Sequence, residues 1–167
     1  MRSGDEDVTI GPYDPTTDAG ATFAVYQAAI RRTAAKDYTP EQIEAWLGRR
    51  GGDLTGWGAA RARARTLVAR AGTGDVVGFT DLLPDGLVDM LFVHPDAGGR
   101  GVARALLTAV AAEARARGLR ELRTFASRTA QPVFERLGFT VWADRPDNTA
   151  RGVVVPNAEM RCTLGPT

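Results

Sequence analysis

The apolar residues alternate between helical and strand-like spacing along the chain, and each change of spacing marks an expected element. Near the N-terminus a short strand precedes two helices, each with capping residues at its start. In the second helix, Thr39, Pro40 and Gln42 have the order of a capping box with proline at the first helical position. We expect the strand at residues 8–10, the helices at 16–32 and 39–47, and a loop at 51–56.

From residue 66 onward the spacing becomes typical of strands. Three strands separated by glycine-containing turns predict an antiparallel meander at residues 66–70, 75–82 and 87–93. The remaining elements alternate, with helices at 102–117 and 129–137 and strands at 122–126, 139–143 and 153–164. The order β-α-α-β-β-β-α-β-α-β-β predicts one α/β domain over residues 1–167, with a mixed, mostly antiparallel sheet and one right-handed crossover after the meander.

Composition narrows the classes of protein and of partner. A formal net charge of +1 gives no general attraction to nucleic acid or to an anionic membrane, so neither is an expected partner. We interpret the arginine-rich stretch 61–70 as a solvated surface segment. Cys162 is the only cysteine, which excludes an internal disulfide and favours a reducing compartment. Without a signal peptide or a membrane-length apolar run, we expect a cytoplasmic protein.

A glycine-rich turn, Gly98-Gly99-Arg100-Gly101, follows the third meander strand and leads into a helix. Unpaired N–H groups at a helix N-terminus suit a phosphate or pyrophosphate, and glycines allow its close approach. Arg100 and Arg104 add positive charge. A Walker-type loop lacks its Lys and hydroxyl here, and the dinucleotide fingerprint lacks its last glycine. A tight helix entry without a ligand is the other reading of these glycines.

At this point the sequence resembles the GNAT N-acetyltransferases. The resemblance lies in Leu91-Phe-Val-His-Pro95 followed by Gly98-Gly-Arg-Gly-Val-Ala103, in Thr129 through Phe139, and in Tyr38 through Trp46. It implies acetyl-CoA as co-substrate, an amine as acceptor, no metal, and a sheet splayed between its fourth and fifth strands with helices on both faces. A homodimer is compatible with this family. The alternative is a non-catalytic acyl-CoA-binding module on the same fold.

The resemblance also assigns site residues. The pantetheine arm would run along the backbone of the strand at 91–93, and the pyrophosphate would rest on the turn and the first helical residues. The expected cofactor-binding residues are Leu91, Phe92, Val93, Gly98, Gly99, Arg100, Gly101, Val102, Ala103, Arg104, Ser127 and Phe134. Three of these depart from the family pattern: Gly98 replaces Gln or Arg, Ser127 replaces Asn, and Phe134 replaces the Tyr that often acts as general acid.

An acetyltransferase that uses amines needs a proton acceptor, because an alkylammonium with a pKa near 10.4 is almost entirely protonated at neutral pH. Asp89 is the expected base, since it interrupts an otherwise apolar strand. Asp81 is the reserve candidate and, with Tyr38 and Trp46, an expected contact of the acceptor. His94, the only histidine, leads into Pro95 near the expected pyrophosphate, which favours a positioning role or none.

Overall fold

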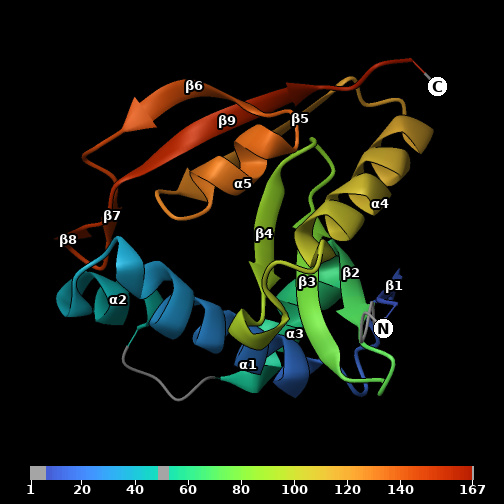
Figure 1. Cartoon of the computed structure of the whole chain (residues 1–167), viewed down its shortest axis with the longest axis horizontal. Helices are drawn as coiled ribbons and strands as arrows, with labels where there is room; N and C mark the ends of the chain where they lie inside the picture. Colours follow the sequence, from blue (N-terminus) through green and yellow to red (C-terminus); the bar gives the residue numbers. More distant parts are fainter. Residues whose placement is uncertain (1–6, 49–52, 167) are drawn as a thin grey trace, which may run out of the picture.

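The computed structural model describes residues 7–48 and 53–166 of the chain. Its strands form two main antiparallel sheets, with helices packed against them (Figure 1). The first sheet has the order β1-β2-β3-β4, with strands Thr9–Pro12, Arg65–Arg70, Val76–Leu82 and Val88–Val93. The second has the order β5-β9-β6, with strands Glu121–Ser127, Asn157–Thr163 and Thr140–Arg145.

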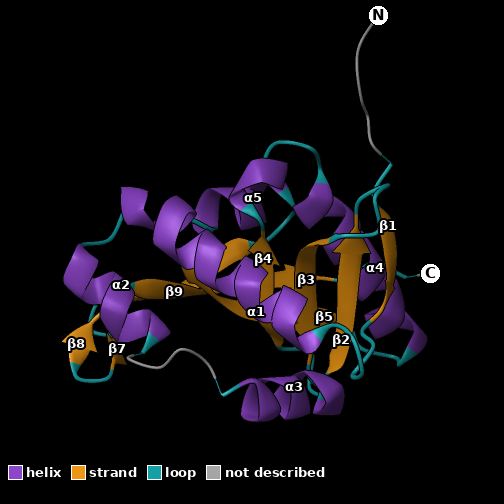
Figure 2. Cartoon of the chain, turned by 90° about the horizontal axis from the view of Figure 1, so that it is seen from below, coloured by secondary structure: helices purple, strands orange, loops and turns teal. Residues whose placement is uncertain are grey.

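Helices cover both faces of the first sheet, as Figure 2 shows. On one face lie α1 (Ala19–Ala28) and α3 (Leu54–Arg63), over a buried cluster that contains Val25, Val68 and Phe79. On the other face lies α4 (Val102–Ala116), whose Leu106 and Val110 join a larger cluster. That cluster also takes in Phe134 of α5 (Gln131–Arg136) and Met160 of β9, so it joins the two sheets into one core. The expected mixed α/β fold is confirmed.

The two sheets meet at one place only among the described residues. A single parallel bridge joins Leu87 to Arg123, and the Thr124 hydroxyl donates to the Val88 carbonyl at 2.9 Å. Beyond this junction β4 and β5 have no pairing, and β4 continues away from β5 toward α1 (Figure 1). The expected splay between the fourth and fifth strands is therefore present, and it leaves one edge of β4 without a strand neighbour.

The first helix widens at its C-terminal end. α1 continues into a π-helical turn, η1 (Ala29–Thr33), and then into a 3₁₀ turn, η2 (Ala34–Lys36). Ile30 and Ala34 anchor these turns in a small buried cluster with residues of α2 (Pro40–Leu47). The predicted capping box of α2 is confirmed, because the hydroxyl of its N-cap residue accepts from the Gln42 N–H while the Gln42 side chain accepts from the N-cap N–H.

Three expectations about local structure were wrong. Of the expected loop at 51–56, residues 51 and 52 lie outside the described residues. The remaining residues belong to the start of α3, because Asp53 caps this helix and its first turn follows directly. The expected strand 153–164 is divided by Pro156 into a short β8 (Val153–Val154) and β9, and β8 pairs with β7 (Thr149–Ala150). Arg61 is buried rather than solvated, because its guanidinium forms an ion pair with Asp81 at 2.8 Å.

Candidate active site

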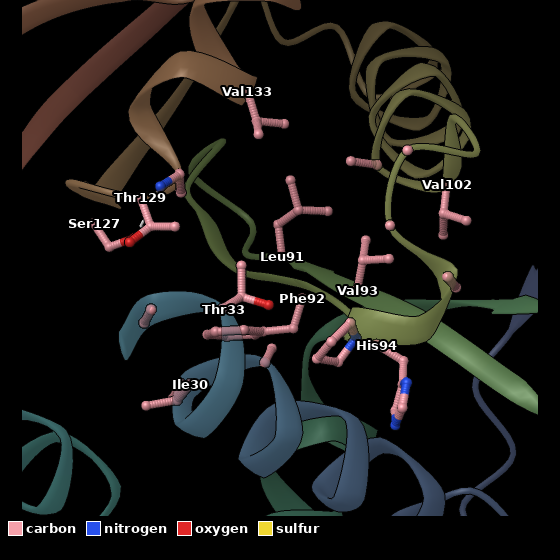
Figure 3. Close-up of a pocket in the computed structure, with 18 of the residues that line it drawn as sticks. Ile30, Thr33, Leu91, Phe92, Val93, His94, Val102, Ser127, Thr129 and Val133 are labelled. Atoms are coloured by element: carbon pink, nitrogen blue, oxygen red, sulfur yellow. Dashed lines mark hydrogen bonds between the residues drawn. The ribbon is translucent and has the colours of Figure 1, made fainter. Parts of the chain in front are cut away.

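A pocket of about 780 Å³ lies where β4 and β5 diverge, between η1 and η2 on one side and α5 and the start of α4 on the other (Figure 3). All of the expected cofactor-binding residues except Arg100 line it. The fold therefore brings the end of β5 to the same cavity as the outer half of β4 and the glycine-rich turn, although the whole of α4 separates β5 from them in the sequence.

The glycine-rich turn leaves room for a ligand at the start of α4. Gly101 is the N-cap residue, with a positive φ of 75°, and no side chain of the described residues caps the helix. A Cβ atom built on Gly99 or Gly101 would meet no other atom of the described chain within 4 Å. Protein packing therefore does not require glycine at these two positions, whereas the left-handed backbone and an open approach to the helix N–H groups do.

The charge of the pocket suits an anionic ligand. None of the described residues that line it is an Asp or a Glu, whereas four cationic side chains do line it. Arg32 forms an ion pair with Asp96 at 2.8 Å. Lys36, Arg104 and Arg136 have no carboxylate partner among the described residues. Together with the positive end of the α4 dipole, these side chains make the cavity electropositive.

The free edge of β4 forms one wall of the pocket. β4 pairs with β3 through Leu91, Phe92 and Val93, and its opposite edge is open beyond Val88. An extended ligand chain can hydrogen-bond to such an edge in the manner of an added strand. His94 follows at the end of the strand, and its Nδ1 accepts from the Asp96 N–H at 3.2 Å, which holds the short turn η3 (Pro95–Ala97). This contact stabilises the turn itself, and a positioning role of His94 toward a ligand stays a prediction.

The hydroxyl-bearing residues of the pocket differ in their hydrogen bonds. The Ser127 hydroxyl accepts from the Ala130 N–H at 3.1 Å, and the Thr129 hydroxyl donates to Asp37 at 2.7 Å. Phe134 is nearly buried and packs edge-on against Phe139, with ring centroids 5.0 Å apart. Its ring lines the cavity where a Tyr would present a proton donor, so the described structure has no phenol at this position.

Asp89 does not line the pocket. It is the extra residue of a β-bulge, because Met90 pairs with Asp81 and Val88 pairs with Leu82. Its side chain is exposed, and its charge is close enough to Asp81 to contribute to the raised pKa of that carboxyl. The bulge therefore interrupts the regular alternation of side chains along β4 at Asp89.

Two of the expected acceptor contacts prove to be structural. Asp81 is fully buried, accepts from the Thr66 hydroxyl at 2.8 Å, and pairs with Arg61, so it cannot touch a substrate. Tyr38 is only 7% exposed. Its hydroxyl donates to the Pro156 carbonyl and accepts from the Arg128 N–H, which uses its hydrogen-bonding capacity within the protein. Trp46, which packs against Tyr38, does line the pocket.

The buried Asp81 carboxylate should make stability depend on pH. Burial raises the pKa of Asp81 to about 6 from an ordinary value of 3.8, although Arg61 and Thr66 lower it in part. Between these values the folded protein binds a proton that the unfolded chain has lost, so the free energy of unfolding falls as the pH rises. We expect a fall of up to about 1.4 kcal/mol per pH unit between about pH 4 and about pH 6.

Chemical denaturation of the wild type and of Asp81→Asn over that range measures this contribution. The substitution also changes packing and hydrogen bonding around position 81 by an amount that does not depend on a proton there, so only the slopes of the two proteins are compared. Equal slopes in the two proteins would contradict a raised pKa at Asp81.

Several lining residues carry no sequence signal. Ile30, Thr33, Ala34 and Lys36 reach the pocket because α1 widens into η1 and η2, a change that the apolar periodicity does not announce. Val133 and Arg136 of α5 also line it. Their spacing within the GNAT-like segment 129–139 was the available signal, since residues three apart on a helix share a face.

The described residues contain no group of three or more His, Cys, Asp or Glu side chains arranged to hold a metal ion. No helix among them combines the length and the apolar character that a membrane span requires.

Comparisons with known proteins agree with one another. Residues 34–164 match the family described as acetyltransferase (GNAT) domain. YafP, an uncharacterized N-acetyltransferase of Escherichia coli (strain K12), is 36% identical over 155 residues, which are 92% of this chain and 95% of that protein.

Solved structures give the same result for the fold. The GCN5-related N-acetyltransferase from Rhodopseudomonas palustris superposes with a TM-score of 0.87 at 34% identity, over 93% of this chain and 95% of that one. yncA from Salmonella typhimurium, solved with its cofactor acetyl-CoA, has a TM-score of 0.73 at 24% identity, over 96% of each chain.

Proposed function

The chain belongs to the GNAT acetyltransferases, and we infer from this that its pocket binds acetyl-CoA and that the enzyme transfers the acetyl group to an amine. The observation that carries this function is the cavity between β4 and β5, because it combines an open helix N-terminus, a free strand edge and a surplus of positive charge. These three features match, in that order, a pyrophosphate, a pantetheine arm and a phosphorylated nucleotide.

We propose that the pyrophosphate lies on Gly99 and Gly101, against the first N–H groups of α4. Arg104 is one turn into that helix and lines the same cavity. The pantetheine arm then extends along Leu91 to Val93, and the thioester reaches the region where η1, β4 and the end of β5 converge. This arrangement depends mainly on backbone groups, which explains how Gly98 is tolerated where the family has a longer side chain.

The reaction is a direct transfer. The amine nitrogen attacks the thioester carbonyl, the new C–N bond forms, and the C–S bond breaks with its electron pair passing to sulfur. In this proposal, backbone N–H groups of β4 stabilise the oxyanion. At neutral pH, forming the neutral, attacking amine from an ordinary ammonium group costs roughly 4 kcal/mol of free energy, so a base must take its proton. We propose Asp89 for this role, acting directly or through water at the exposed bulge.

A ligand-binding measurement tests the cofactor assignment. Acetyl-CoA at ten times its dissociation constant should raise the free energy of unfolding by about 1.4 kcal/mol, because it binds only the folded protein. Thermal denaturation with and without acetyl-CoA measures the effect, and the release of free thiol with a panel of small amines, amino acids and peptides identifies the acceptor. A protein that shows no thermal shift and releases no thiol would contradict the assignment.

A further inference from the structure

Acetyl transfer produces a thiolate that needs a hydrogen-bond donor, and Phe134 cannot supply one. The inference that follows rests on the proposed function. An ordinary thiol has a pKa near 8.5, so a departing thiolate at neutral pH is unstable until it is solvated or protonated. A donor that meets the sulfur only as the C–S bond breaks would stabilise the transition state more than the bound substrate. The hydrogen-bond donors among the pocket side chains therefore determine how well the departing thiolate is stabilised.

Three hydroxyl groups line the pocket among the described residues, on Thr33, Ser127 and Thr129. The Thr129 proton is directed at Asp37. The Ser127 hydroxyl accepts from the Ala130 N–H, which uses part of its acceptor capacity and leaves its proton free to donate. The Thr33 hydroxyl makes no hydrogen bond within the described part of the chain. Thr33 is therefore the pocket hydroxyl with both its donor and its acceptor capacity available.

The π-helical turn explains why the Thr33 hydroxyl is available. Threonine in an α-helix usually donates to the carbonyl three or four residues earlier. Thr22 of α1 does so, since its hydroxyl donates to the Asp18 carbonyl at 2.8 Å. Thr33 closes η1, where the backbone ladder shifts to a wider spacing, and no such bond forms there. Single π-helical turns often occur at functional sites.

The position of Thr33 matches the expected place of the sulfur. Its side chain rises from η1 into the part of the pocket that Leu91, Phe92 and Thr129 also line (Figure 3). The glycine-rich turn lies at the opposite end of the cavity, beyond Val93 and His94. A cofactor with its pyrophosphate at that turn and its arm along β4 would bring its thioester to the Thr33 end. Ile30 and Ala34, both buried, hold η1 against the core and fix this position.

We propose that Thr33 is a catalytic residue that donates a hydrogen bond to the cofactor sulfur as the C–S bond breaks. The hydroxyl keeps its proton throughout. The electron pair of the C–S bond passes to sulfur, the proton of the attacking amine leaves through the base, and the thiolate takes a proton from water. Thr33 thus substitutes for the phenol that is absent at position 134, as a hydrogen-bond donor and not as an acid.

The test measures the thiol of bound CoA, which requires no turnover. The ultraviolet absorbance of the thiolate is followed against pH in the CoA complexes of the wild type, Thr33→Val and Thr33→Ser. We expect Thr33→Val to raise the thiol pKa by about half a unit to one unit and to lower kcat about fivefold, with little change in CoA affinity. Thr33→Ser, which keeps the hydroxyl, should restore both values. Thr108→Val, an exposed helical position, is the matched control.

Each result separates this inference from the proposed function. If no variant and no wild-type protein binds CoA, the proposed function fails. If CoA binds and Thr33→Val leaves both the thiol pKa and kcat unchanged, the role of Thr33 is overturned while the acetyltransferase assignment stands. A Thr33→Ser enzyme as impaired as Thr33→Val would assign the effect to packing, and a shift found only in Ser127→Ala would move the donor to Ser127. Either result would also overturn the inference.

Discussion

Replacing Asp89 with Asn is expected to lower turnover at neutral pH by roughly 10²-fold while leaving acetyl-CoA affinity nearly unchanged. Asn keeps the size of the side chain but has no oxygen basic enough to accept the amine proton. Asp89 does not line the cofactor pocket, so the substitution leaves the expected cofactor contacts intact. The loss should shrink as the pH rises toward the pKa of the amine, where the acceptor deprotonates without help.

Initial rates of thiol release between neutral and alkaline pH, at saturating acetyl-CoA, measure this effect. Asp147→Asn removes the same charge from an exposed carboxylate outside the pocket, so it controls for the change in net charge. If Asp89→Asn kept near-wild-type turnover, the proton acceptor would be a water chain and not Asp89. Asp81 could not replace it, because Asp81 is fully buried and cannot meet the amine. The assignment of the enzyme to the acetyltransferases would be unaffected.

The second large effect is expected at Gly101. Valine at this position should reduce acetyl-CoA affinity at least tenfold, because its branched side chain would occupy the open space over the N-terminus of α4. The backbone there has a φ of 75°, which a β-branched residue adopts only with strain, so some loss of folding stability is also expected. Isothermal titration with acetyl-CoA, combined with thermal denaturation, measures the two effects separately.

Gly118 provides a matched control for the strain. It has a φ of 76° after the C-terminal end of α4, and a Cβ atom there would also meet no atom of residues 7–48 and 53–166 within 4 Å. Gly118 does not line the pocket. Gly118→Val should therefore lose a similar amount of stability but keep its coenzyme affinity. If the two variants bind acetyl-CoA equally well, the turn at Gly101 does not hold the pyrophosphate.

Features fixed by local chemistry could be predicted from the sequence. The capping box of α2 depends on residues three apart, and the glycine-rich entry to α4 needs only its own φ values. The meander follows from short turns between alternating strands, and the observed register of β2, β3 and β4 agrees with it. This entry and the outer half of β4 form one wall of the pocket, so that wall could be predicted from the sequence.

Features that depend on long-range contacts could not be predicted. α3 contains Gly56 and Gly58, and its low helix propensity concealed it, whereas burial of Arg61 against Asp81 and packing of Trp57 stabilise it in the fold. The place of β9 between β5 and β6 is set by pairings between residues distant in the chain. Tyr38 resembled a binding residue, but Pro156 and Arg128, which satisfy its hydroxyl, come from segments far away in the sequence.

The open edge of β4 has a consequence for how the enzyme turns over. If the pantetheine arm lies along this edge, it takes the place of a missing strand, because the only β-bridge between the two half-sheets in the described chain joins Leu87 to Arg123. The spent coenzyme then leaves by breaking its hydrogen bonds to β4 one after another, starting from the solvent end, as an edge strand separates from a sheet. The residence time of the product would be set by main-chain groups, so relatives with different side chains along the gap should release coenzyme at similar rates.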